Sequence, residues 1–242
     1  MKKLIIIFIS LLLISGCNKS KQLTTEEYLL QIIENHKNAS SLTIDINSRV
    51  NLGQNNTSIP IPIKATLLLD NKGNNDINDD EAYGKVSLSL VLMSLDIEGW
   101  YNDGIFYYKY GDDKRIVEVP KPEYRQIDEN KVLQIIQDNC EDIVLDTNVN
   151  STTITLTPKS DLLKSLLKEL NVPNLPTIEN IDLNEMLDNI NFNDVVLTID
   201  KNGYISKIKA SGDVKFSTYY INGQIQLQFK DINKTTIPAR NF

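Results

Sequence analysis

The sequence contains few of the residues that bind metals or form disulfides. Its 242 residues include one histidine, His36, and two cysteines, Cys17 and Cys140. These are too few for a zinc cluster or a disulfide framework, and we expect no cofactor. The formal net charge is −7, so the chain also lacks the basic surface that binds nucleic acid. Composition therefore excludes zinc modules, disulfide scaffolds and nucleic-acid-binding proteins.

The longest apolar run is too short to cross a membrane. Leu4–Ile14 is almost entirely apolar, whereas a spanning helix needs about 20 such residues. Lys2 and Lys3 precede the run, which together with its length is typical of an export signal. Residues 14–17, Ile-Ser-Gly-Cys, resemble the lipobox of bacterial lipoproteins. That resemblance implies cleavage before Cys17 and attachment of a diacylglyceryl group, with fatty chains such as palmitate, to its thiol.

These features predict the organisation and location of the chain. Residues 1–16 form the signal peptide, 17–23 a tether, and 24–242 a single domain. The extended tether reaches about 20 Å at most, so the domain is expected close to the extracytoplasmic face of the cell membrane, in a Gram-positive bacterium. The alternative is an ordinary signal peptide with a coincidental cysteine.

Three segments have helical patterns. Thr24 and Glu27 are spaced as a capping box, and an apolar stripe that includes His36 extends the helix to about Asn38. A second helix is expected from about 128 to 139. A third follows Ser160 and carries five leucines before Pro173.

Most of the remaining chain alternates apolar and polar residues with the period of a strand. Long strands are expected around 42–52, 59–69 and 82–92. Pro60 and Pro62 lack N–H groups on the same lateral side, so the start of their strand is expected at an edge. Gly-containing turns at 102–104, 111–113, 201–203 and 222–223 predict hairpins. Helices on one face of an antiparallel sheet define an α+β fold.

The layout resembles a known family. The most family-like segments are 100–107 (WYNDGIFY) and 197–204 (LTIDKNGY). With the lipobox, the capped helix and the final strand meander, they resemble the LolA/LppX-like lipoprotein superfamily, most closely its uncharacterised Gram-positive relatives. The resemblance implies a curled antiparallel sheet, an incomplete β-barrel, with helices packed on its concave face. Several members hold lipid or acyl chains in that hollow.

The leading hypothesis is a non-enzymatic, membrane-anchored protein that binds a lipid or acyl chain between the curved sheet and the leucine-rich helix. Its expected cavity residues are Leu88, Leu90, Leu92, Leu163, Leu166, Leu167 and Ile208. Small residues expected to point inward either allow tight curvature over a filled core or leave volume for a ligand: Ala65, Ala82, Gly84, Ala210 and Gly212. The alternative is a protein- or cell-wall-interaction module with a filled core. We expect a monomer.

Other candidate sites have simpler interpretations. His36 is expected to pack between helix and sheet, since no Gly-x-Ser-x-Gly motif accompanies it. Cys140 is expected to be an inert thiol whose acidic neighbours raise its pKa. The acidic segment 70–81 is either a solvated loop or a calcium site. Aromatic residues around Trp100 either stabilise the sheet or form a carbohydrate platform. A hydrolase with dispersed carboxylates is the remaining alternative.

Overall fold

The computed structural model describes residues 23–54, 57–70, 81–90, 93–102, 105–118, 128–148, 151–169, 177–178, 181–182, 190–216 and 219–240. The predicted signal peptide, residues 1–16, and Cys17 lie outside these residues. Among the described helices, none combines the length and the apolar character needed to span a bilayer.

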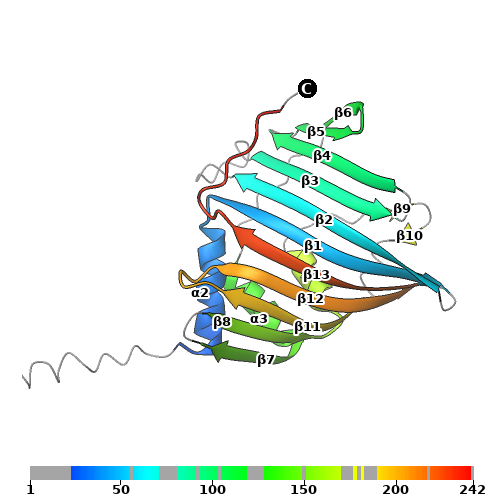
Figure 1. The fold of residues 1–242 in the computed structure, drawn as a ribbon. Coiled ribbons are helices and arrows are strands. Elements are labelled where there is room, and N and C mark those ends of the chain that lie inside the picture. Colours follow the sequence, from blue (N-terminus) through cyan, green and yellow to red (C-terminus); the bar gives the residue numbers. More distant parts are fainter. Residues whose placement is uncertain are drawn as a thin grey trace, which may run out of the picture.

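The dominant element is one antiparallel sheet of eleven strands in the order β6-β5-β4-β3-β2-β1-β13-β12-β11-β8-β7 (Figure 1). Its strands are β1 Ser41–Gln54, β2 Thr57–Asp70, β3 Glu81–Leu90, β4 Met93–Asn102, β5 Ile105–Tyr110, β6 Asp113–Glu118, β7 Cys140–Thr147, β8 Thr152–Pro158, β11 Ile190–Ile199, β12 Ile205–Phe216 and β13 Tyr219–Lys230. A separate pair comprises β9 Thr177–Ile178 and β10 Ile181–Asp182. The sheet curls without closing, which confirms the expected α+β fold with an incomplete barrel.

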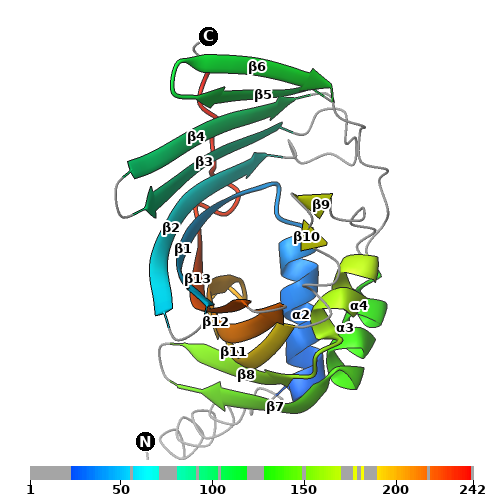
Figure 2. The same cartoon turned by 90° about the vertical axis from the view of Figure 1, so that its right-hand side faces the viewer.

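The three helices among the described residues lie on the concave side of the sheet (Figure 2). They are α2 Thr25–Lys37, α3 Glu129–Asp138 and α4 Leu162–Glu169. The capping box predicted for α2 is present, since Glu27 N–H donates to Thr24 Oγ1 at 3.2 Å and Thr24 N–H donates to Glu27 Oε2 at 2.9 Å. Ion pairs link the helices in series: Lys37 with Glu129, and Lys131 with Glu169.

The filled core lies between these helices and one end of the sheet. Its buried members come from α2, α3, α4 and strands β7, β8 and β11: Leu29, Ile32, Leu133, Cys140, Ile154, Leu156, Leu162, Leu197 and Ile199. No residue of β1 to β6 belongs to this buried cluster. The helices therefore support only one half of the described sheet.

The prolines of β2 mark an edge as predicted. Along its whole length β2 pairs with β1, and Pro60 lies opposite Asn51. Pairing with β3 begins only at Ile63, opposite Leu88. The segment before Ile63 therefore has no described neighbour on its β3 side, which is where a strand tolerates residues without an N–H.

One predicted turn is wrong. Asn222 and Gly223 do not form a hairpin loop but lie within β13, where Gly223 is opposite Gly212 of β12 and Val50 of β1. Phe216 pairs with Tyr219, so the chain reverses between them. Pairing with strands on both sides therefore overrides the turn preference of an Asn-Gly pair.

The C-terminal segment 231–240 crosses the outer, convex side of the sheet. Asn233 N–H donates to the Ser41 carbonyl oxygen at 2.8 Å, and the hydroxyls of Thr43 and Thr235 are 2.9 Å apart. Further along, Trp100 Nε1 donates to the Pro238 carbonyl oxygen at 3.2 Å. The Arg240 guanidinium lies over the Tyr107 ring, 3.6 Å from its centroid. This segment thus joins β1 to β4 and β5 across the outside of the sheet.

Candidate functional site

A continuous apolar row crosses the inner face of the sheet. Directly paired residues lie on the same face, and the printed registers connect one residue from each of ten strands. From β7 to β5 the row is Leu145, Ile154, Leu197, Ile208, Leu227, Ile46, Ala65, Val86, Ile97 and Tyr110. We call the surface that contains this row the inner face. Its other positions on β1 to β4 are also mainly aliphatic.

The exposure of this row changes from one end to the other. Ile154 is 0% exposed and Leu197 is 9% exposed, because both lie beneath the helices. Val86 and Ile97 are only partly buried, and Tyr110 is 46% exposed. One face of one sheet therefore has a filled half and an open half, with the same apolar chemistry in both. The open half, on β1 to β4 and β13, is the candidate site.

Small residues widen the open half locally. A methyl group added at Gly84 would meet one described atom within 4 Å, Leu67 Cδ1 at 3.7 Å. Ala65 and Ala82 occupy neighbouring positions on the same face, and the register confirms that all three small residues point inward. At Gly99, opposite Gly84, the Phe106 ring already fills the space, with its Cζ 2.7 Å from an added methyl group.

The four predicted cavity residues whose side chains are described separate into two groups. Leu88 lies on the open half of the inner face, where it pairs with Ile63 and Leu95. Leu166 and Ile208 instead pack against the filled core, and Leu163 is partly buried on the same helix as Leu166. The remaining three lie wholly or by their side chains outside the described residues: Leu90, Leu92 and Leu167.

The aromatic residues are divided between the two faces. Tyr83, Trp100 and Tyr107 are cross-strand neighbours on the outer face, and the Tyr83 and Trp100 rings are 5.0 Å apart. Phe106 and Tyr108 lie on the inner face, where their rings stack at 5.9 Å. The C-terminal segment already contacts Trp100 and Tyr107. The outer aromatic residues therefore pack within the protein and do not form an open platform.

The outer face has polar depressions. One of about 460 Å³ lies over β11, β12, β13 and β1 and is lined by side chains that include Arg49, Gln224 and Gln226. Another of about 380 Å³ lies over β13, β1, β2 and β3. Near it, Lys230 pairs with Asp45 and Thr66 donates to Asp45 Oδ1 at 2.9 Å. The hydrogen bond from Lys230 lowers the pKa of the Asp45 carboxyl. Charged and amide side chains of this kind do not suit an apolar ligand.

His36 lies at the border between the filled and open halves, and Cys140 lies in the filled core. His36 packs between α2 and the sheet as predicted, with ring contacts to Tyr204 and Phe229. Cys140 is buried in the core, and burial raises the pKa of its thiol, while Lys159 opposes the shift. The raised pKa was predicted, but the predicted cause was wrong, because its acidic neighbours Glu141 and Asp142 are exposed.

The described residues contain no cluster of three or more His, Cys, Asp or Glu side chains suited to a metal ion. The acidic segment considered for calcium lies mostly outside them, at residues 71–80.

Comparisons with known proteins give structural likenesses at low identity. No protein-family model matches the sequence, and no curated protein matches it. Among solved structures, LprF from Mycobacterium bovis is 12% identical with a TM-score of 0.47, over 88% of this chain and 95% of that chain. A putative outer membrane lipoprotein-sorting protein domain from Vibrio parahaemolyticus is 10% identical with a TM-score of 0.29, over 89% and 95%. The MucA/MucB complex of Pseudomonas aeruginosa is 11% identical with a TM-score of 0.32, over 88% and 58%.

Proposed function

We propose that this chain is a non-enzymatic, membrane-anchored lipoprotein that binds the acyl chain of a lipid on the open half of its inner face. The observation that carries the proposal is the apolar row, which continues with unchanged chemistry from the filled core to partly exposed side chains. Apolar surface that is exposed and contiguous marks an interaction site. The concave shape and the small residues at Ala65, Ala82 and Gly84 favour a slender apolar ligand.

The energetics favour a long acyl chain. Each CH₂ group removed from water contributes about 0.8 kcal/mol, so a dozen would contribute roughly 10 kcal/mol. Association itself costs about 4–15 kcal/mol. Short acyl chains therefore bind poorly, and affinity rises with chain length. Binding of this kind needs no catalytic group, because desolvation provides the driving force.

Binding is tested with the mature chain, residues 17–242, produced without its signal peptide and titrated with cis-parinaric acid, a fluorescent fatty acid. Ala65→Phe would fill the open half, and we expect about tenfold weaker binding, equivalent to about 1.4 kcal/mol. Lys64→Phe is the matched control, because Lys64 is the adjacent residue on the outer face. It should bind like the unchanged chain.

Equal affinity of the two variants would place the probe elsewhere and overturn the proposal. Native mass spectrometry of the same preparations gives a second readout, since co-purified lipid is expected on the unchanged chain and on Lys64→Phe. If no preparation binds lipid, the open half is instead the contact surface of an interaction module.

The anchor is tested separately in cells that are given alkyne-labelled palmitate. The full chain should incorporate the label, and Cys17→Ser should remain unlabelled and leave the membrane fraction. Label on both proteins, or on neither, would remove the membrane anchor from the proposal while leaving acyl-chain binding intact.

A further inference from the structure

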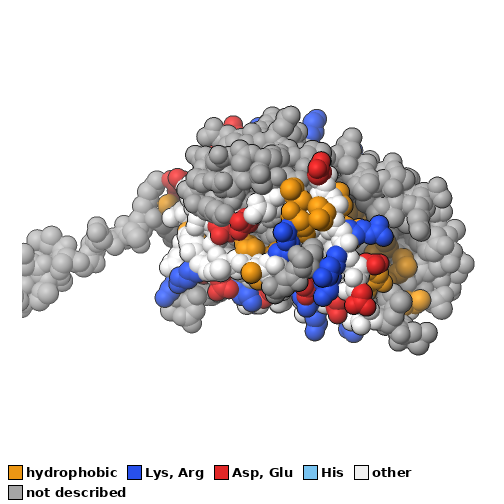
Figure 3. All heavy atoms as spheres, turned by 90° about the horizontal axis from the view of Figure 1, so that it is seen from above, with side chains coloured by type: hydrophobic (Ala, Val, Ile, Leu, Met, Phe, Trp, Pro, Cys, Tyr) orange, Lys and Arg blue, Asp and Glu red, His pale blue; other side chains and the backbone are white. Residues whose placement is uncertain are grey.

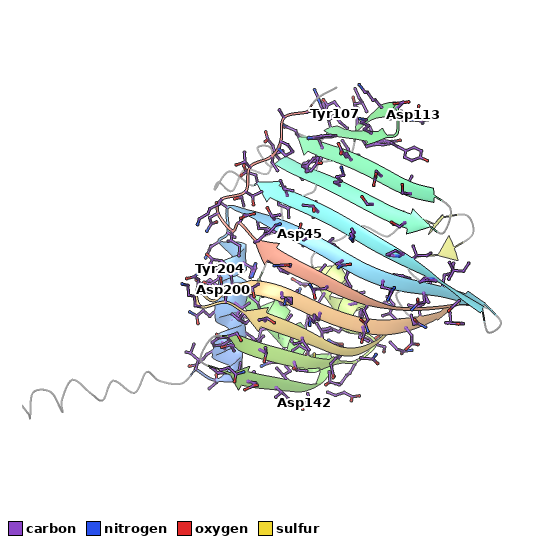
Figure 4. All side chains as sticks on the ribbon, viewed as in Figure 1. Asp45, Tyr107, Asp113, Asp142, Asp200 and Tyr204 are labelled. Atoms are coloured by element: carbon purple, nitrogen blue, oxygen red, sulfur yellow. The ribbon has the colours of Figure 1, made fainter. Side chains whose placement is uncertain are left out.

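The outer face carries a polar groove, on the side of the sheet opposite the proposed acyl-chain site. Its two depressions, of about 460 Å³ and about 380 Å³, share two lining residues, Asn47 and Gln226. They therefore adjoin, and together they cross the strands from β11 to β3; we call them the polar groove. Figure 4 looks onto the outer face and shows Asp45, which lines the groove, near the middle of the sheet. The groove is thus a separate candidate site.

A row of four polar residues lies along the groove. Lys209, Gln226, Asn47 and Lys64 are successive cross-strand neighbours on β12, β13, β1 and β2. Since directly paired side chains lie on the same face, two side-chain amides separate two ammonium groups. Arg49, two positions from Asn47 on β1, adds a guanidinium to the same groove. The polar groove therefore combines amide groups with cations at three points.

Three of the four described cations that line the groove have no acidic partner within the described part of the chain. No described residue forms an ion pair or a side-chain hydrogen bond with Arg49, Lys64 or Lys209, and all three are exposed. The fourth, Lys85, pairs with Glu98 at 2.9 Å. At the end of the molecule that is uppermost in Figure 1, by contrast, Figure 3 shows basic and acidic side chains close together. The groove therefore differs from a surface on which the two signs are interspersed.

The two carboxylates that also line the groove have partners of their own. Asp45 pairs with Lys230, and Asp194 accepts from Thr157 Oγ1 at 3.2 Å. The described lining thus has four cations against two carboxylates, although the formal net charge of the whole chain is −7. A concave site lined mainly by one sign of charge attracts ligands of the opposite sign. The groove is therefore suited to an anionic ligand.

We propose that the polar groove binds a saccharide chain that carries acidic groups. The acidic groups pair with Lys64, Lys209 and Arg49 through charge-assisted hydrogen bonds. The hydroxyls bond to Asn47 and Gln226, because a side-chain amide offers both donors and an acceptor, as each hydroxyl does. Lys209 and Lys64 are three strand spacings apart, roughly 14 Å. This separation suits a chain with repeated acidic groups better than one small anion.

Two other anionic partners fit the groove less well. Extended peptides commonly add a strand to a free sheet edge, where backbone hydrogen bonds provide the affinity. The row lies on β12, β13, β1 and β2, each of which pairs with a strand on either side, so only side chains are offered to a ligand. Binding at a bilayer surface needs apolar side chains that enter the lipid, whereas the four residues of the row are polar. A polar chain rich in hydroxyls matches these side chains better.

The test is binding of fluorescein-labelled oligogalacturonate, a saccharide with a carboxylate on each unit, to the full chain in detergent solution. Fluorescence anisotropy should show binding that weakens as salt rises from about 0.05 M to about 0.5 M, because salt screens exposed charges. Arg49→Gln and Lys209→Gln should each lower the affinity about fivefold, the upper range for an exposed ion pair. Lys201→Gln is the matched control, because Lys201 is an exposed lysine outside the groove, on the turn between β11 and β12. It should bind like the unchanged chain.

Two further measurements separate a saccharide site from a general attraction of anions. Gln226→Ala leaves the charge unchanged and should lower the affinity about threefold, the effect of losing one neutral hydrogen bond. Unlabelled polyglutamate should compete for the groove less well than unlabelled oligogalacturonate, because its backbone finds no free strand edge there. Circular dichroism of each variant checks the fold, which surface substitutions of this kind leave nearly unchanged in stability.

Several results would overturn the proposal. These are no binding of the saccharide, equal affinity of Lys209→Gln and Lys201→Gln, or unchanged affinity of Gln226→Ala. Polyglutamate that competes as well as the saccharide would assign the groove to acidic peptides instead. Arg49, Lys209 and Gln226 lie on the outer face, so acyl-chain binding does not depend on them. The two proposals therefore fail independently.

Discussion

His36 on α2 and Ile205 on β12 are joined by a hydrogen bond in which the Ile205 N–H donates to the imidazole Nε2 at 2.7 Å. Only an unprotonated Nε2 can accept this bond. The bond fixes the C-terminal end of α2 to the start of a central strand of the filled half. Tyr204 and Phe229 enclose the ring from two sides. Because protonation of His36 would break this hydrogen bond, the attachment of α2 to β12 depends on pH.

Stability should fall as the pH is lowered. Burial lowers the pKa of His36, which outweighs the opposing effect of Asp200. The folded state therefore favours the neutral ring, so this contribution is complete above the ordinary histidine pKa of about 6.5 and is lost as pH falls through the lower folded value. Urea unfolding between about pH 8 and about pH 5 measures the effect. His36→Gln retains an acceptor but does not titrate, and its stability should change less over that range. An equal change would assign the pH dependence to other groups.

Truncation at two positions of the apolar row should have unequal effects. Ile154→Ala removes a fully buried side chain and should lower the free energy of unfolding by about 2–5 kcal/mol. Ile97→Ala, in the same row on β4, should cost about 1 kcal/mol because its side chain is only partly buried. Chemical denaturation of both variants tests the difference. Equal losses would mean that the open half is packed as tightly as the core.

The cap of α2 should have a measurable effect on stability. Thr24→Ala removes the side chain that accepts from Glu27 N–H and should destabilise the protein by about 1 kcal/mol. Thr25→Ala, one residue later, leaves the cap intact and should be close to neutral. Thermal melts followed by circular dichroism compare the two. Similar melts for both variants would show that the capping box does not limit stability.

Cys140 should be protected from thiol reagents in the native state. It is 7% exposed, and burial raises the pKa of its thiol. In a Cys17→Ser background, we expect no reaction with Ellman's reagent until the protein is unfolded. An added Ile116→Cys thiol is the accessible control and should react at once. Rapid native labelling at Cys140 would contradict the packing described for the core.

The elements that depend on local sequence were predictable. The capping box at Thr24, the alternation of the strands and the edge marked by Pro60 all follow from rules that act within a few residues. The connection between β1 and β13 was not predictable, because it pairs Thr43 with Lys230 across most of the chain. The same non-local pairing explains the missed turn at Gly223.

The candidate site was only partly predictable for the same reason. Sequence alternation identified Leu88 and Ile208 as inward-facing, but both were assigned to one cavity. Ile208 lies on β12 and packs against the filled core. Leu88 lies on β3, four strands away from β12 in the sheet. A residue's face is therefore a local property, whereas its neighbours depend on the whole topology.

The C-terminal segment has a mechanical consequence. It is attached at Thr43 on β1 and again at Trp100 on β4, with β2 and β3 between them. None of the described helices contributes core residues that pack with these strands from within. The C-terminal segment, residues 231–240, therefore limits from the outer face how far β1 and β4 can move apart.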